Sequence, residues 1–307
     1  MKSRIANNLA LVAPLLMLAR PVLVAADIQI VVNGNLLGNS IEYSGVNGQM
    51  SYNSTQLDDV GFNSWRIWDD LNDFESQDDN VWDNSMGNHR SFFDQLKADN
   101  VELYLSMRNT CWGCQWLTKP PQSDADWNEW WEHVFAEIYW LNVRNDYQFD
   151  FFEVGIRSSI IHAWVKVLTH ICANCQIFNE PDNSGQGWGG TEAQYLQFAA
   201  VTADAINFLY EKYIPDRKPR ILGPAVDYPQ VPSDSSVPGG KGWIDDLLGL
   251  EPAAINAISF HSYLTLSELT WGVNYAHGLA ANHGNSDMPV WISELGTYDQ
   301  LGNGAAQ

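Results

Sequence analysis

Two short motifs carry the carboxylates that could do chemistry in this chain. Glu180 lies in FNEPD and Glu294 lies in WISELG, and each motif follows or ends an apolar segment typical of a buried strand. A carboxylate pair can break a glycosidic bond, because one group protonates the leaving oxygen while the other attacks the sugar. A separation of about 5–5.5 Å between them gives retention of configuration. Each motif alone is also compatible with an ordinary surface glutamate at the start of a loop.

Seven apolar segments alternate with helical segments and are predicted to be strands. They comprise residues 41–47, 64–70, 101–108, 149–153, 220–226, 257–263 and 289–296. Apolar residues at three- and four-residue spacing mark helices after Ser123, a residue typical of an N-cap, and after Thr191. This alternation predicts parallel strands joined by crossover helices.

Polar or aromatic residues end most of these predicted strands: Asn47, Arg66, Asp69, Arg108, His261, Tyr263 and Glu294. In a (β/α)8 TIM barrel the C-terminal strand ends converge on one face, where the active site is built. A doubly wound sheet would instead need a glycine-rich phosphate loop after its first strand, and the sequence has none there. We therefore predict an α/β fold of the TIM-barrel type. Because we count seven strands and the chain stops soon after Glu294, we expect the barrel to be truncated before its eighth strand.

Residues 154–176 interrupt the fourth predicted strand just before Glu180. Without them the sequence reads FDFFE-IFNEPD, a continuous strand that leads into the Asn-Glu-Pro turn. Val154 is encoded by GTN and Gln176 can be encoded by CAG, which are the borders of an in-frame spliceosomal intron, and Leu168–Thr169 can encode a branch point. We favour a retained intron translated through a gene-prediction error. The alternative is a genuine inserted helix, although insertions belong in loops rather than in central strands.

The sequence resembles the retaining glycoside hydrolases of clan A, and within that clan it is most similar to family 39, the β-xylosidase and α-L-iduronidase family. The similarity lies in FNEPDNSGQGWGGTEAQY, LGPAV, ISFHSY and VWISELG, with GFNSWRIWDD and PPQSDADWNEWW upstream. It implies a glycosidase that hydrolyses O-glycosyl bonds without a cofactor. By this resemblance Glu180 on strand four is the acid/base and holds a proton, whereas Glu294 on strand seven is the nucleophile and stays ionised.

Five further residues are candidates for contacts with the substrate or the nucleophile: Asn179, Arg66, Trp188, His261 and Tyr263. The resemblance implies that Asn179 bonds the sugar 2-hydroxyl, and that the side chains at 261 and 263 contact the sugar or Glu294. Trp188 is placed to stack on a sugar ring, or else it packs under a loop. Arg66 is expected to hold Glu294 charged, or to pair with the aspartates at 69 and 70. For His261, a satisfied core histidine is the alternative.

Four cysteines form two CxxC pairs, Cys111 with Cys114 and Cys172 with Cys175. Two such pairs can bind zinc, whereas in an exported protein local disulfides compete with that interpretation. The second pair lies within residues 154–176 and would be absent from a correctly spliced protein. We therefore predict a loop disulfide between Cys111 and Cys114, and no metal site.

The N-terminus predicts export from the cell. Lys2 and Arg4 precede an apolar run and a small-residue segment, which is the order of a signal peptide over residues 1–26, leaving a catalytic domain over 27–307. Arg20 interrupts the run, so a membrane anchor is a poor alternative. The formal net charge of -21 argues against nucleic acid or anionic membranes as partners.

These observations predict a secreted retaining glycosidase that acts on a cell-wall or related carbohydrate. Two alternatives stay open. One is a non-catalytic sugar-binding barrel or inactive fragment, which the missing strand and the interruption keep in consideration. The other is a zinc-stabilised secreted protein, which only the cysteine spacing favours. The sequence does not specify the sugar, the linkage, exo or endo action, or the oligomeric state.

Overall fold

A computed structural model describes part of the chain: residues 43–47, 61–68, 90–107, 120–154, 181–182, 190–227, 242–263 and 266–295. All of these belong to one compact unit, Glu42–Gln307. The predicted signal peptide lies outside the described residues. Among the described helices, none has both the length and the apolar character that crossing a membrane requires.

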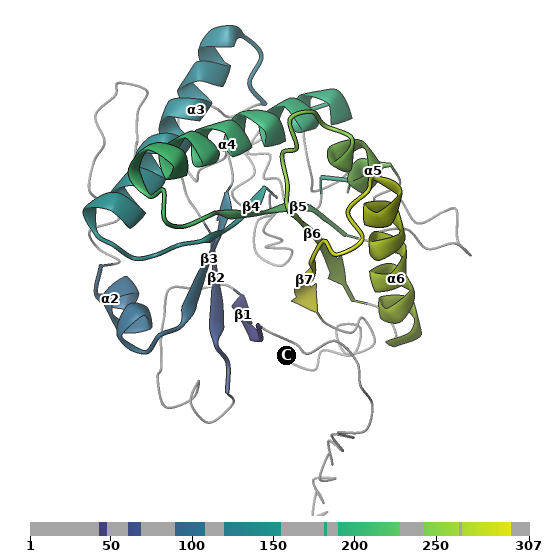
Figure 1. Cartoon of the computed structure of the whole chain (residues 1–307), viewed down its shortest axis with the longest axis horizontal. Helices are drawn as coiled ribbons and strands as arrows, with labels where there is room; N and C mark the ends of the chain where they lie inside the picture. The colour runs from purple at the N-terminus through teal and green to yellow at the C-terminus, as the bar shows by residue number, and fades with distance from the viewer. Residues whose placement is uncertain are drawn as a thin grey trace, which may run out of the picture. The chain divides into compact units, whose positions relative to one another are not determined.

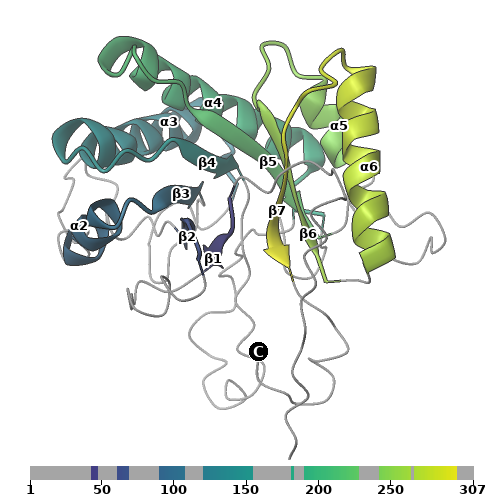
Figure 2. The same ribbon diagram turned by 60° about the horizontal axis from the view of Figure 1, so that its bottom comes forward.

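Seven parallel strands form one sheet, in which the spatial order follows the sequence order (Figure 1). The strands are β1 (Gly45–Asn47), β2 (Ser64–Trp68), β3 (Glu102–Met107), β4 (Phe151–Val154), β5 (Arg220–Val226), β6 (Ala257–Ser262) and β7 (Val290–Leu295). The sheet curls into a half-barrel with helices outside it (Figure 2). The predicted strands and the barrel-like α/β fold are thereby confirmed.

The helices are α2 (Arg90–Ala98), α3 (Asp124–Ile138), a π-helix η3 (Tyr139–Arg144), α4 (Glu192–Tyr213), α5 (Trp243–Leu248) and α6 (Leu266–Asn282). Capping boxes begin both of the helices that the sequence marked most clearly. The Ser123 hydroxyl accepts the Asp126 N–H at 3.2 Å, and the Asp126 carboxylate accepts the Ser123 N–H at 3.0 Å. Thr191 and Gln194 make the same exchange at the start of α4. The predicted N-cap at Ser123 is confirmed.

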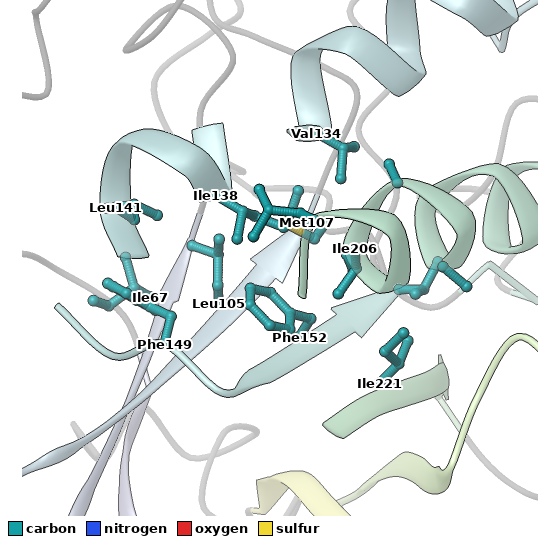
Figure 3. Packing of buried hydrophobic residues seen from close by; sticks show 14 of the residues in the cluster. Ile67, Leu105, Met107, Val134, Ile138, Leu141, Phe149, Phe152, Ile206 and Ile221 are labelled. Carbon is teal, nitrogen blue, oxygen red and sulfur yellow. The ribbon is translucent and has the colours of Figure 1, made fainter. Parts of the chain in front are cut away.

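The outer face of the sheet is apolar and packs against the helices (Figure 3). Side chains alternate between the two faces of a strand. Leu105, Phe152 and Ile221 therefore point outward from neighbouring strands and belong to the same buried cluster as Ile138 of α3 and Ile206 of α4. Because this face is buried against α3, η3 and α4, the alternate side chains of β3 and β4, such as Ser106 and Glu153, point toward the inside of the curl.

The inner face changes character along the strands. At its N-terminal end, Tyr43, Phe151 and Trp291 form an aromatic floor, with ring centroids 5.0 to 5.2 Å apart. Two residues farther along β4 and β7, the inward positions carry Glu153 and Ser293. The floor fills the barrel interior, and the polar positions above it lie toward the end of the sheet where barrel enzymes build their sites.

Strand β4 ends one residue later than the sequence predicted. Val154 is fully buried, lies opposite Met107 of β3, and belongs to the outer core. It is also the first residue of the predicted insertion. If residues 154–176 were removed, Ile177 would take this place, so either version of the chain puts a β-branched apolar residue there. The remainder of the predicted insertion lies outside the described residues.

Candidate active site

Arg66 on β2 is the centre of a buried charge network inside the curled sheet. Its Nη1 donates to Oε1 of Glu294 on β7 at 2.9 Å, and its Nη2 donates to Oε2 of Glu153 on β4. Nη2 also lies 3.3 Å from Oγ of Ser106 on β3. All four side chains are buried. One guanidinium thus joins two carboxylates from strands that are distant in the sequence, which lowers the cost of burying each charge.

Both carboxylate oxygens of Glu294 are held by hydrogen bonds. Arg66 donates to Oε1, and the Tyr263 hydroxyl, which follows β6, donates to Oε2. Nε2 of His261 lies 3.8 Å from Oε1, beyond direct hydrogen-bond distance. These contacts fix the orientation of the carboxylate at the C-terminal end of β7.

A bulge in β7 aims Glu294 into the network. Phe260 lies opposite Ile292, but the next residue of β6, His261, lies opposite Glu294, so Ser293 is the extra residue of β7. An ordinary strand would place Ser293 and Glu294 on opposite faces. The bulge breaks that alternation, as bulges beside active sites commonly do to redirect a side chain.

The charges in this network are stable at neutral pH. Burial alone would raise the pKa of Glu153, but the Arg66 guanidinium, followed by His261 and the hydroxyls of Tyr104 and Ser293, outweighs burial and lowers this pKa. Burial also opposes the charge of Arg66, yet the neighbouring carboxylates more than compensate and raise its pKa. The network therefore carries one positive and at least one negative charge in a site from which water is largely excluded.

The structure brings together four of the residues that the sequence singled out: Arg66, His261, Tyr263 and Glu294. Arg66 is bonded to Glu294, whereas its alternative partners, Asp69 and Asp70, lie outside the described residues. His261 is fully buried beneath that carboxylate. The other candidates lie outside the described residues: Asn179, Glu180, Trp188, Cys111 and Cys114.

The chain directly after Glu180 is described, and it lies beside β5. Pro181 is buried, and Oδ1 of Asp182 accepts a hydrogen bond at 3.0 Å from the backbone N–H of Asp227, the residue after β5. Asp227 is at the C-terminal end of its strand, as Glu294 is near the end of β7. The Pro181–Asp182 segment is thus anchored at the C-terminal end of the sheet.

Sequence reasoning missed Glu153. It was treated as the border of an apolar strand, although it shares Arg66 with Glu294 and has no exposed surface. A signal was present, because period-2 alternation puts Glu153 on the same face as Phe151, inside a strand buried on both faces. A charged residue at such a position is rare unless it is paired.

The described residues of this network do not form a metal-binding group. Within the described ranges, His, Cys, Asp and Glu side chains form no group of three or more that could hold a metal ion. The four cysteines of the two CxxC pairs are not among the described residues. The described site instead combines the Glu294 carboxyl group with the Arg66 guanidinium and the Tyr263 phenol.

A family model described as "Glycosyl hydrolase catalytic core" matches residues 161–307, slightly less than half of the chain. The matched region includes β7 and Glu294. Together with the barrel-like fold, it supports a glycoside hydrolase. A search of curated protein sequences found no significant match.

Three solved structures share the fold. A glucosidase from Croceicoccus marinus has 12% identity and a TM-score of 0.55, with 82% of this chain and 51% of that chain covered. A GH39 β-xylosidase from Caulobacter crescentus has 18% identity and a TM-score of 0.54, with 82% and 53% covered. XEG5A, a GH5 xyloglucan-specific endo-β-1,4-glucanase from a metagenomic library, has 14% identity and a TM-score of 0.50, with 80% and 67% covered. At these identities the likeness shows the fold alone, and the chain spans about half the length of the first two enzymes.

Proposed function

We propose that the protein is a secreted retaining glycoside hydrolase that cleaves O-glycosidic bonds of a cell-wall or related carbohydrate. The observation that carries this proposal is Glu294, held through both oxygens by Arg66 and Tyr263 at the C-terminal end of β7. Sequence motifs similar to family 39 and a GH39 β-xylosidase among the similar folds make β-xylosides the first substrates to test. The family 39 assignment and the sugar both belong to the proposal.

In the proposed first step, a carboxylate oxygen of Glu294 attacks the anomeric carbon as the bond to the leaving oxygen breaks. Glu180 gives its proton to that oxygen, and the sugar stays covalently bound to Glu294 as an ester. In the second step, Glu180 takes a proton from water, the water oxygen attacks the anomeric carbon, and the ester bond breaks to release Glu294. Arg66 and Tyr263 keep Glu294 oriented and favour its ionised form before the attack.

The acid/base and the sugar contacts complete the proposal. Glu180 directly precedes the Pro181–Asp182 segment, which is anchored at the C-terminal end of β5, and this adjacency supports its proposed role as the acid/base. Asn179 is proposed to bond the sugar 2-hydroxyl, and Trp188 to stack on a sugar ring. His261, wholly buried, would act on Glu294 rather than on the sugar.

Strand register supports the proposal that residues 154–176 do not belong to the working enzyme. Glu153 lies opposite Leu222, and Asp227 is the fifth residue after Leu222. Without residues 154–176, Asp182 would be the sixth residue after Glu153, so a direct strand would bring it close to Asp227. Asp182 is bonded to Asp227. Asp182 therefore lies beside the C-terminal end of β5, which carries a bulge between Pro224 and Val226, and a continuous fourth strand would lead to the same end of the sheet.

A deletion tests this proposal together with the activity. We expect a chain without residues 154–176 to gain hydrolysis of aryl glycosides relative to the full chain. Sequencing the transcript across Phe149–Pro181 and on to its stop codon should show that those codons are absent. If the transcript retains them and the deletion variant does not fold, the inserted helix is the correct interpretation.

Substitution of each glutamate tests the assigned roles. Glu294→Gln and Glu180→Gln should each lower kcat/KM by at least about 10³-fold, since each removes a group required for bond cleavage. Glu211→Gln, an exposed position on α4, is the control and should leave kcat/KM unchanged. If the deletion variant binds oligosaccharides without turning them over, the protein is a sugar-binding barrel.

Secretion and the disulfide are also proposals. Signal cleavage after Ala26 would make Asp27 the first residue of the exported protein, which N-terminal sequencing can determine. A disulfide between Cys111 and Cys114 would leave both unreactive toward thiol reagents until the protein is reduced.

A further inference from the structure

Glu153 has no part in the two proposed chemical steps, yet it occupies the other half of the Arg66 guanidinium. Its side chain has no exposed surface, so it cannot reach a sugar or a water molecule in the site. It cannot replace the acid/base, because the neighbouring cation keeps it ionised. Its strongest contact is the ion pair with Arg66, and Ser106, His261, Tyr104 and Ser293 also act on its carboxylate.

We propose that Glu153 is a positioning residue whose charge divides that of Arg66 between two carboxylates and so sets the pH at which Glu294 ionises. The geometry carries this inference: Nη1 serves Glu294 and Nη2 serves Glu153. A guanidinium presents its donors in a fixed fork. Glu153 therefore fixes the direction in which Nη1 points, and it also neutralises charge that Glu294 would otherwise experience alone.

Every described strand that packs against this network adds groups that could affect the same titration. The groups facing it are Arg66 from β2, Tyr104 and Ser106 from β3, Glu153 from β4, His261 from β6, Tyr263 after β6, and Ser293 and Glu294 from β7. The pKa of Tyr104 is raised well above its ordinary range, first by burial and then by Glu153, so its phenol is neutral. Around the titrating Glu294, the charged groups of this set are Arg66 and Glu153, and His261 is the remaining titratable neighbour.

Glu153→Gln tests the charge while keeping the shape. With a neutral amide at 153, the full charge of Arg66 acts on Glu294, and a repulsive negative charge is removed. Glu294 should then ionise at a pH about one unit lower than in the wild type, since a nearby charge shifts carboxylate titration by about one to three units. The acidic limb of kcat/KM should move to lower pH by the same amount. A role in packing alone would lower activity or stability without moving that limb.

The direct measurement follows the carboxyl ¹³C resonances of glutamate-labelled protein during a pH titration, with the Glu294 signal assigned from Glu294→Gln. This readout needs no turnover, so it separates failure of this inference from failure of the proposed activity. Glu153→Asp keeps the charge at position 153. In this variant the titration midpoint of Glu294 should lie within a few tenths of a pH unit of its wild-type value. Glu137→Gln, at an equally buried glutamate on α3, is the control for placing an amide in the core and should not shift Glu294.

An unchanged or higher titration midpoint of Glu294 in Glu153→Gln would overturn the inference. If that variant does not fold, the wild type still provides a test. The inference requires Glu153 to remain ionised throughout the pH range in which Glu294 titrates. If Glu153 takes up its proton at a higher pH than Glu294 does as the pH is lowered, the proposed division of charge is excluded.

Discussion

Glu153 on β4 and Glu137 on α3 are both completely buried, but the groups that face them differ. Glu153 is paired with Arg66, whose side chain keeps its proton in any protein environment. Glu137 lies one helical turn after His133, with 3.7 Å between Oε2 and the histidine Nε2. Burial lowers the pKa of His133 from 6.5 to about 3, so the imidazole is neutral at the pH of most growth media.

The difference between these partners distinguishes the candidate site inside the curl from the helical core around α3. Inside the curl, an arginine supplies a permanent charge that can act on Glu294, which is the preorganised electrostatics that its proposed role as nucleophile requires. On α3, the described contact of the Glu137 carboxylate is with His133, which burial keeps neutral. That histidine stacks against Trp130 at 5.8 Å, and Trp130 stacks in turn against Phe198 of α4 at 4.7 Å. Among the described contacts, Glu153 therefore faces a permanent charge, whereas Glu137 faces a neutral ring.

Removing the fixed cation should produce the largest effect. Arg66→Met leaves two carboxylates buried without a counter-charge, and we expect the free energy of unfolding at pH 7 to fall by about 3–5 kcal/mol. Urea denaturation measures this loss. Arg66→Lys, which keeps a charge but loses the forked geometry, should lose less. A loss below about 1 kcal/mol in Arg66→Met would mean that the two carboxylates do not depend on this arginine.

The histidine of α3 should make stability depend on pH. Because the pKa of His133 is about 3 in the folded protein and near 6.5 in the unfolded chain, its contribution is constant above pH 6.5. Below pH 6.5 the unfolded state binds the extra proton, so stability is lost by about 1.4 kcal/mol per pH unit as the pH falls toward 3.

His133→Phe keeps a ring against Trp130 and removes the proton site. Between pH 7.5 and 4.5 the wild type should therefore lose about 2–3 kcal/mol more stability than this variant does. Urea denaturation of both proteins at the two pH values provides the measurement. Parallel losses in the two proteins would show that folding does not lower the pKa of His133, and the comparison with Glu153 would fail.

Much of the fold could be predicted because its signals are local. All seven strands coincide with apolar segments. The Ser123 capping box involves only Ser123 and Asp126, so it can be predicted from a stretch of four residues. The end of β4 was predicted one residue short, because Val154 fits both a strand and the start of the predicted insertion.

The candidate site was harder to predict because it depends on register and on contacts across the barrel. Glu294 could be found from its motif and Arg66 from its place near the end of a strand. The bulge at Ser293 turns Glu294 inward. It could not be predicted, because a bulge is defined by the pairing of β7 with β6 and the sequence of β7 alone does not specify that pairing. Glu153 was missed for a related reason: only the pairing of Nη2 with its carboxylate, 87 positions away, shows that the two belong together.

A neutral hydrogen bond in the α3 region should give the smallest effect. The Thr202 hydroxyl on α4 accepts the indole N–H of Trp130 at 2.9 Å and donates to the carbonyl of Phe198 at 2.8 Å. Thr202→Val preserves the shape but leaves the buried indole N–H without its acceptor, so we expect a loss of about 1–2 kcal/mol. Thr202→Ser retains the hydroxyl and should lose less. Because neither partner titrates, the loss from Thr202→Val should be equal at pH 5 and pH 7.5 in urea denaturation. A loss that grows as the pH falls would show that this hydrogen bond is coupled to His133, and that the α3 core also contains an electrostatic network.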